Sequence, residues 1–134
     1  MNRSPKLLKS FMREFWRQTA PHSSDRACSM FCVSDVPVVW FWLARKDGYI
    51  WLENIWSTQE GNGYGSKALD WFCTLADEFG VEIRGDIQPP HGGRLDYEEL
   101  SAWYQRRGFS VDGREMCREP KIVPRRLASW PIPT

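Results

Sequence analysis

The stretch that decides the fold runs from Tyr49 to Gly80 and reads YIWLENIWSTQEGNGYGSKALDWFCTLADEFG. Its first part, residues 49–57, is rich in β-branched and aromatic residues, which is typical of a strand. Glycines follow at positions 61, 63 and 65, and apolar residues then recur at helical spacing as far as Phe79. The order is therefore a strand, a glycine-rich loop and a helix, with Gly80 placed to end the helix.

The glycine-rich loop has the properties of an anion-binding site. Its glycines let the backbone approach a ligand closely, because they carry no Cβ atom. The first helical turn leaves N–H groups unpaired at the positive end of the helix dipole, where a phosphate is the natural ligand. Spacing excludes a Walker loop, because Lys67 precedes Ala68 rather than Ser or Thr. It also excludes the Gly-x-Gly-x-x-Gly loop of dinucleotide-binding proteins, because the three glycines alternate.

Two segments carry a resemblance to a known family. The loop E-G-N-G-Y-G, residues 60–65, resembles the R/Q-x-x-G-x-G/A loop with which the GNAT superfamily of N-acetyltransferases binds the pyrophosphate of acetyl-coenzyme A. The segment W-Y-Q-R-R-G-F, residues 103–109, is similar to the family's late helix. The resemblance spans residues 38–118, and small GNAT-like proteins of tailed bacteriophages look most similar. It implies direct transfer of an acetyl group from acetyl-coenzyme A, the co-substrate, to an amine acceptor in a ternary complex.

The resemblance also implies which residues form the site. Tyr104 takes the family position of the general acid, and a phenol with an ordinary pKa of about 10 is protonated at neutral pH. The strand main chain would bind pantetheine at Ile55, Trp56 and Ser57. The loop would bind the pyrophosphate through Gly61, Asn62, Gly63, Tyr64, Gly65 and Ser66.

Glu53 is the candidate for the general base. The two-residue repeat of a strand places it on one face with Trp51 and Ile55, and a carboxylate can take a proton from the attacking amine through a water molecule. An ordinary exposed carboxylate is the competing interpretation. For Tyr104 the competing interpretation is a ring packed on the buried face of the helix beside Leu100.

Glu60, the expected lack of the family's first strand and the excess of tryptophan favour an alternative function. Glu60 stands where the family prefers Arg or Gln, and its charge would repel phosphate unless Gln59 takes that role. Tyr97 stands where many members carry an Asn that contacts the coenzyme. The alternative is a GNAT-fold binding or interaction module without catalytic activity.

The rest of the chain predicts an α/β (α+β) domain. Ser4-Pro5 begins an amphipathic helix, and residues 19–27 are predicted to be a loop. Strand-like runs at 28–33, 38–45 and 49–57 form an antiparallel meander, and a strand at 81–87 pairs in parallel with the last of these. A capping box of Asp96 and Glu99 starts a helix that runs to Arg107, and strands follow at 109–111 and 115–118.

The family resemblance completes this expectation. It implies a GNAT-like mixed sheet whose parallel strands splay apart, with helices on both faces. The family's first strand is missing, since only residues 1–4 precede the first helix, so the acceptor side is open or is completed by a partner chain in a homodimer. The expected organisation is an N-terminal helix and loop at 1–27, an acetyl-coenzyme A-binding core at 28–120 and a proline-rich tail at 121–134.

Composition narrows the class of protein. With 134 residues, 42% hydrophobic content and a net charge of +1, the chain is expected to be one globular domain without general attraction to nucleic acid or membrane. Its eight tryptophans are expected either to line a groove or to fill the core. The four cysteines lack the paired spacing of a zinc site, even with His22 nearby, and no signal peptide is recognised. We therefore expect a cytoplasmic protein with reduced thiols and no metal.

Overall fold

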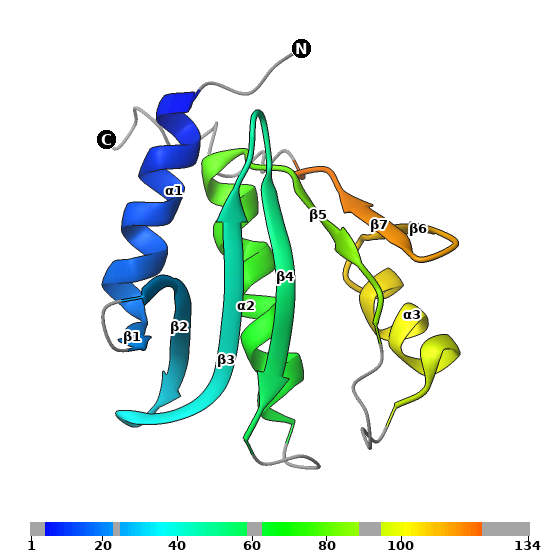
Figure 1. Cartoon of the computed structure of the whole chain (residues 1–134), viewed down its shortest axis with the longest axis horizontal. Helices are drawn as coiled ribbons and strands as arrows, with labels where there is room; N and C mark the ends of the chain where they lie inside the picture. Colours follow the sequence, from blue (N-terminus) through cyan, green and yellow to red (C-terminus); the bar gives the residue numbers. More distant parts are fainter. Residues whose placement is uncertain (1–4, 23–24, 59–62, 89–94, 122–134) are drawn as a thin grey trace, which may run out of the picture.

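The computed structural model describes residues 5–22, 25–58, 63–88 and 95–121 (Figure 1). The helices and strands in these ranges are α1 (Pro5–Gln18), β1 (Ala20–His22), β2 (Asp25–Val33), β3 (Val36–Arg45), β4 (Ile50–Ser57), α2 (Tyr64–Phe79), β5 (Ile83–Asp86), α3 (Tyr97–Gln105), β6 (Ser110–Asp112) and β7 (Glu115–Arg118). None of these helices is long and apolar enough to span a membrane.

The strands form one mixed sheet with the order β1-β2-β3-β4-β5-β7-β6. Neighbouring strands are antiparallel except for β4 and β5, which are parallel and are connected through α2. The parallel pairing joins Ile50–Leu52 to Ile83–Gly85 and then stops, and Figure 1 shows β5 turning away from β4. The predicted meander and the predicted splayed parallel pair are both confirmed.

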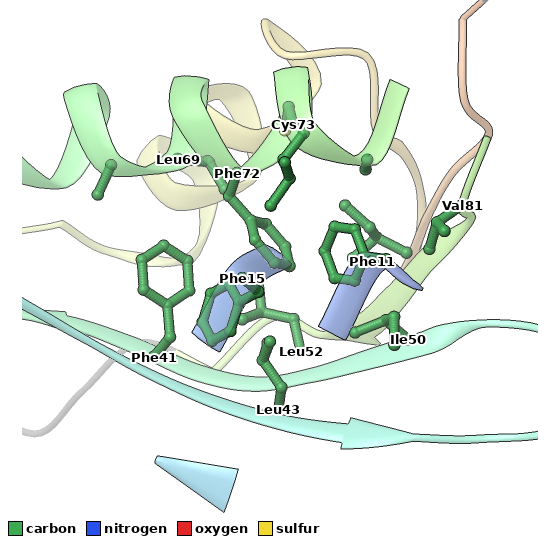
Figure 2. Packing of buried hydrophobic residues seen from close by; sticks show 14 of the residues in the cluster. Phe11, Phe15, Phe41, Leu43, Ile50, Leu52, Leu69, Phe72, Cys73 and Val81 are labelled. Carbon is green, nitrogen blue, oxygen red and sulfur yellow. The ribbon is translucent and has the colours of Figure 1, made fainter. Parts of the chain in front are cut away.

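A layer of phenylalanine rings joins the sheet to the helices (Figure 2). The ring centroid of Phe41 on β3 lies 5.1 Å from that of Phe72 on α2. The rings of Phe11 and Phe15 on α1 lie 5.7 and 6.0 Å from Phe72. The two-residue repeat of β3 places the Phe41 ring on the face of the sheet that the helices cover. The helical spacing of α1 and α2 places their three rings on the sides of the helices that face this core. Since each ring is at most 1% exposed, α1 shares one core with the sheet and α2.

All three described helices pack on the same face of the sheet, whereas helices on both faces were predicted. Phe15 contacts Phe41 as well as α2, so α1 and α2 lie on one side of β3. On that same side α3 lies beside α2, where Trp103 Nε1 donates a hydrogen bond of 2.8 Å to Ser66 Oγ. The prediction is wrong because hydrophobic periodicity reveals that a helix has a buried side, not which face of a sheet it covers. We call the face without a described helix the open face.

The segment 19–27 contains strand structure where a loop was predicted. β1 pairs antiparallel with β2, with Ala20 opposite Met30, and β2 already begins at Asp25. Pro21 favoured the loop interpretation, but an edge strand tolerates a proline because one side of its backbone needs no partner. Among the described residues, the sheet edge beside β2 is thus formed by a strand that follows α1.

The predicted start of α3 and the predicted end of α2 are confirmed, whereas α3 ends at Gln105, before the predicted end at Arg107. At the start of α3, Glu99 N donates to Asp96 Oδ1 at 2.8 Å and Asp96 N donates to Glu99 Oε1 at 2.9 Å, which is a complete capping box. Gly80 ends α2 in the left-handed conformation with a φ of 66°, which glycine adopts without a Cβ clash.

A buried ion pair ties β7 to α2. Arg118, which is 3% exposed, donates from Nη1 and Nη2 to the two carboxylate oxygens of Asp77 at 2.8 and 3.0 Å. Its Nε donates to the carbonyl of Arg107 at 2.7 Å. The pair therefore holds β7 against α2 and against the residues that follow α3.

We expect Asp77→Ala to lower the free energy of unfolding by about 3 kcal/mol, because it leaves the Arg118 guanidinium buried without its counter-charge. Urea denaturation measures this loss. The control is Arg17→Ala, which breaks the solvent-exposed pair with Glu14 and should leave the urea midpoint unchanged. Equal midpoints for the two variants would contradict a structural role for the buried pair.

Candidate functional site

The N-terminus of α2 has the geometry expected of an anion site. Gly63 is the N-cap with a φ of 75°, no side chain caps the helix, and its first turn carries no acidic residue. The helical hydrogen bond from Lys67 N reaches Gly63 O, so the N–H groups of Tyr64, Gly65 and Ser66 have no intrahelical acceptor. A Cβ atom on Gly63 would meet no described atom within 4 Å. These N–H groups can therefore receive an anion in front of the helix.

Part of the predicted loop cannot be located. Gly61 and Asn62, and the residues Gln59 and Glu60 whose effect on phosphate was at issue, lie outside the described residues. The structural account of the loop accordingly begins at Gly63.

The predicted pantetheine segment occupies the end of β4. Its residues Ile55, Trp56 and Ser57 pair with β3 on one side. On the other side the pairing with β5 has already stopped at Leu52. Backbone N–H and C=O groups inside a protein require partners, so the strand edge that β5 does not pair with suits an extended ligand that can hydrogen-bond to it.

A β-bulge at Glu53 changes which side chains face together. The register between β3 and β4 shifts between Trp42 and Leu43, so Glu53 has no residue opposite it. The prediction that Glu53 shares its face with Trp51 and Ile55 is therefore wrong for Ile55, which packs against the hydrophobic core. The bulge leaves Glu53 and the next residue both exposed.

Tryptophans gather on the open face of the meander. Trp40 stacks on Trp42 with ring centroids 5.6 Å apart, and its centroid lies 6.1 Å from that of Trp56. Trp40 and Trp42 are two residues apart on β3, and Trp40 lies opposite Trp56 on β4. The two-residue repeat places them on the face opposite the phenylalanine layer. Part of the tryptophan content is thus on a surface rather than in the core.

A hollow of about 420 Å³ opens beside these tryptophans, where β4 and β5 separate. Its lining residues are Trp42, Trp51, Glu53, Asn54, Asp86 and Gln88. Only Glu53 was identified from the sequence as a site residue. The sequence did contain a signal for the bulge. Leu52 and Ile55 both pack in or against the core although they are three residues apart, which breaks the two-residue repeat of a regular strand.

Tyr104 lies on the helix side of the sheet and is 5% exposed. Its ring centroid lies 5.0 Å from Trp103 and 5.2 Å from Phe109. Burial, with a smaller contribution from Cys73, raises the pKa of the Tyr104 phenol well above its ordinary value. The buried ring agrees with the interpretation of Tyr104 as a packing residue. The raised pKa keeps the phenol protonated, which a general acid also requires. Tyr104 is not among the residues that line the hollow, so the two predicted catalytic residues lie on different faces of the sheet.

One group of potential metal ligands lies away from this region. The ligand atoms of Glu82, Cys117 and Glu119 lie within 4.8 Å of one another. The Glu82 carboxylate already accepts a hydrogen bond from Arg84 at 2.6 Å and one from Cys117 at 3.0 Å. Burial and this bond to Glu82 raise the pKa of the Cys117 thiol to about 11. The group is therefore engaged in internal pairing.

The buried thiol nearest to the candidate acid should be unreactive. Burial raises the pKa of Cys73 to about 11, so at pH 7 to 8 the thiol is protonated and a thiolate nucleophile is scarce. We expect iodoacetamide to label Cys73 slowly in the folded protein below pH 9 and rapidly after denaturation, as measured by peptide mass spectrometry. Fast labelling of folded protein at pH 7.5 would instead indicate an activated cysteine and a mechanism through an acyl-enzyme.

Comparison with known proteins supports the fold. No protein-family model and no curated protein matches the sequence. A putative acetyltransferase of the GNAT family from Bacteroides thetaiotaomicron has a similar structure, with a TM-score of 0.54 and 14% identity over 93% of this chain and 85% of that chain. The anti-CRISPR protein AcrVA5 is also similar, with a TM-score of 0.51 and 22% identity over 60% of this chain and 88% of that chain. At these identities the likeness shows a GNAT-like fold.

Proposed function

We propose that this GNAT-like chain is an N-acetyltransferase that moves an acetyl group from acetyl-coenzyme A to an amine acceptor. The observation that carries the proposal is the end of the parallel pairing at Leu52 and Gly85, while β4 continues to Ser57 and leads toward the N-terminus of α2. This arrangement offers a strand edge that β5 does not pair with, and then helical N–H groups that have no intrahelical acceptor. An amide-containing arm that ends in a pyrophosphate matches this sequence of groups.

Each part of the co-substrate has a described counterpart. Main-chain groups of Ile55–Ser57 would hydrogen-bond the pantetheine amides, because β5 does not occupy that edge. The N–H groups of Tyr64, Gly65 and Ser66 and the helix dipole would stabilise the pyrophosphate charge. Ser66 is already held in place by its hydrogen bond from Trp103. The fit thus uses backbone groups, whose positions depend on the fold more than on particular side chains.

Acid catalysis is assigned to Tyr104 in this proposal. Expulsion of the coenzyme thiolate is easier when a donor supplies a proton, and burial keeps the Tyr104 phenol protonated over the physiological pH range. The alternative is a GNAT-fold module without catalytic activity. It is favoured by the tight packing of the Tyr104 ring against Trp103 and Phe109, which gives the residue a structural purpose.

Coenzyme binding is tested most cleanly at Gly65. Among the described residues, a Cβ atom there would contact the Trp103 ring at 3.7 Å, whereas the positive φ of Gly63 makes any substitution there strain the fold as well. We expect Gly65→Val to weaken acetyl-coenzyme A binding in calorimetry by roughly tenfold or more, because its methyl groups crowd the helix N-terminus. Gly65→Ala should have a smaller effect, and both variants should keep the parent circular dichroism spectrum. Unchanged affinity in Gly65→Val would place the coenzyme elsewhere.

Catalysis is tested by Tyr104→Phe, which keeps the ring and removes the proton. Acetyl-coenzyme A affinity and thermal stability should hold, while the rate of acetyl transfer falls by roughly 10²-fold or more. The control is Tyr49→Phe, directly before β4, where the ring packs against Arg84; it also removes a phenol hydroxyl and should leave the rate close to that of the parent. A Tyr104→Phe protein as fast as the parent would remove Tyr104 as the acid and favour the alternative module.

A further inference from the structure

The charged side chains described in the lining of the hollow between β4 and β5 are all negative. Its polar lining groups are the carboxylates of Glu53 and Asp86 and the amides of Asn54 and Gln88, and none of the described lining residues is a lysine, arginine or histidine. Neither carboxylate forms an ion pair with any described residue. Two carboxylates at one concave surface, neither with a counter-charge among the described residues, attract a cation, and low-dielectric walls strengthen the attraction.

The walls of the hollow add a second preference. The indoles of Trp42 and Trp51 are half-buried at its side, and tryptophan is the best aromatic partner for a cation. A volume of about 420 Å³ is large enough for an aliphatic chain of several carbons.

The position of the hollow relates it to acyl transfer. It lies where the β4–β5 pairing ends, beside the strand edge to which the pantetheine arm is assigned, and it contains the candidate base Glu53. The bulge turns Glu53 and Asn54 together toward the hollow rather than to opposite faces. A group held in the hollow would therefore approach the end of that arm from the open face.

We propose that this hollow is the acceptor site and that it selects a primary alkylammonium group carried on a flexible aliphatic chain. The inference rests on the proposed acetyltransferase function and specifies its substrate class. Asp86 and the two indoles hold the cationic acceptor, while Glu53 takes its proton directly or through water. Acceptors that carry a carboxylate near the amine are rejected, because Glu53 and Asp86 repel it.

The resulting transfer balances in atoms and charge. The alkylammonium gives a proton to Glu53, and the freed nitrogen lone pair forms a bond with the acetyl carbon. The carbon–sulfur bond breaks, and its electron pair leaves with the sulfur. The attacking nitrogen still carries an extra proton after the new bond forms, and it releases this second proton to water. Tyr104 gives its proton to the sulfur and regains one from solvent, and Glu53 returns its proton to solvent before the next turnover. The products are the acetamide and the free coenzyme thiol.

Two matched acceptors test the charge preference. Cadaverine and 5-aminopentanoate have the same length, but the second replaces one ammonium group by a carboxylate. We expect the KM of cadaverine to be lower by roughly tenfold or more and to rise with salt, as screening of exposed charges requires. Nα-acetyl-lysine amide carries a single alkylammonium, and comparing its KM with that of cadaverine distinguishes a free diamine from a protein lysine as the source of the group. Equal use of cadaverine and 5-aminopentanoate would overturn the proposal.

Variants of the lining test the assignment of residues. Asp86→Asn should raise the KM for cadaverine by roughly tenfold with little change in kcat, because it removes one attractive charge and keeps the shape. Trp51→Leu should raise the same KM several-fold, because it keeps apolar bulk and removes the π face. Glu53→Gln should instead flatten the acidic limb of the pH–rate profile. Asp112→Asn, on the exposed strand β6, is the matched control and should change none of these quantities.

Separate binding measurements distinguish failure of this inference from failure of the proposed function. Calorimetry with acetyl-coenzyme A alone tests the function, and calorimetry with cadaverine alone, on the parent and on Asp86→Asn, tests the hollow. Coenzyme binding together with cadaverine binding that ignores Asp86→Asn would overturn the acceptor site and leave the acetyltransferase standing. Cadaverine binding that Asp86→Asn weakens, without any coenzyme binding, would support a cation site in the hollow and overturn its role in acetyl transfer.

Discussion

The contact between Phe41 and Phe72 is the interaction on which the remaining structure depends. It joins the central strand β3 to α2, and the two α1 rings that touch Phe72 complete one buried layer. Aromatic pairs of this kind contribute about 0.5–1.5 kcal/mol each beyond the burial of their area. Because α1 and α2 share this layer and α3 packs beside α2, the opposite face of the meander is left to tryptophans, and the hollow lies there.

A requirement of backbone chemistry gives the candidate site its shape. A sheet that stays fully paired satisfies its own N–H and C=O groups and has no need of a ligand. Here β4 and β5 separate inside the sheet rather than at its rim, because β5 pairs with only the first part of β4. The site is therefore an interruption in a ladder of hydrogen bonds, with the start of α2 at one end and the bulge at Glu53 along its side.

Local patterns in the sequence predicted much of this fold. The Asp96–Glu99 capping box, the Gly80 helix end and the alternation of Val39, Phe41 and Leu43 depend on neighbouring residues, so they can be read along the chain. The side of the sheet covered by the helices depends on contacts such as that of Phe15 with Phe41, which join residues distant in sequence. The same limit applies to the site. The loop and Tyr104 stood out through motifs, whereas Asp86 and Gln88 reach the hollow only because two strands diverge.

Both outer strands of the sheet, β1 and β6, are three residues long. An edge strand presents unpaired main-chain groups to any extended segment that meets it, and short edges give such a segment little to pair with. One of them also contains Pro21, which has no N–H to donate. The sheet is thus poorly suited to growth by addition of a strand from another molecule. A second copy of the chain that associates with this one would have to use side-chain surfaces, of which the open face with its tryptophans is the most apolar described above.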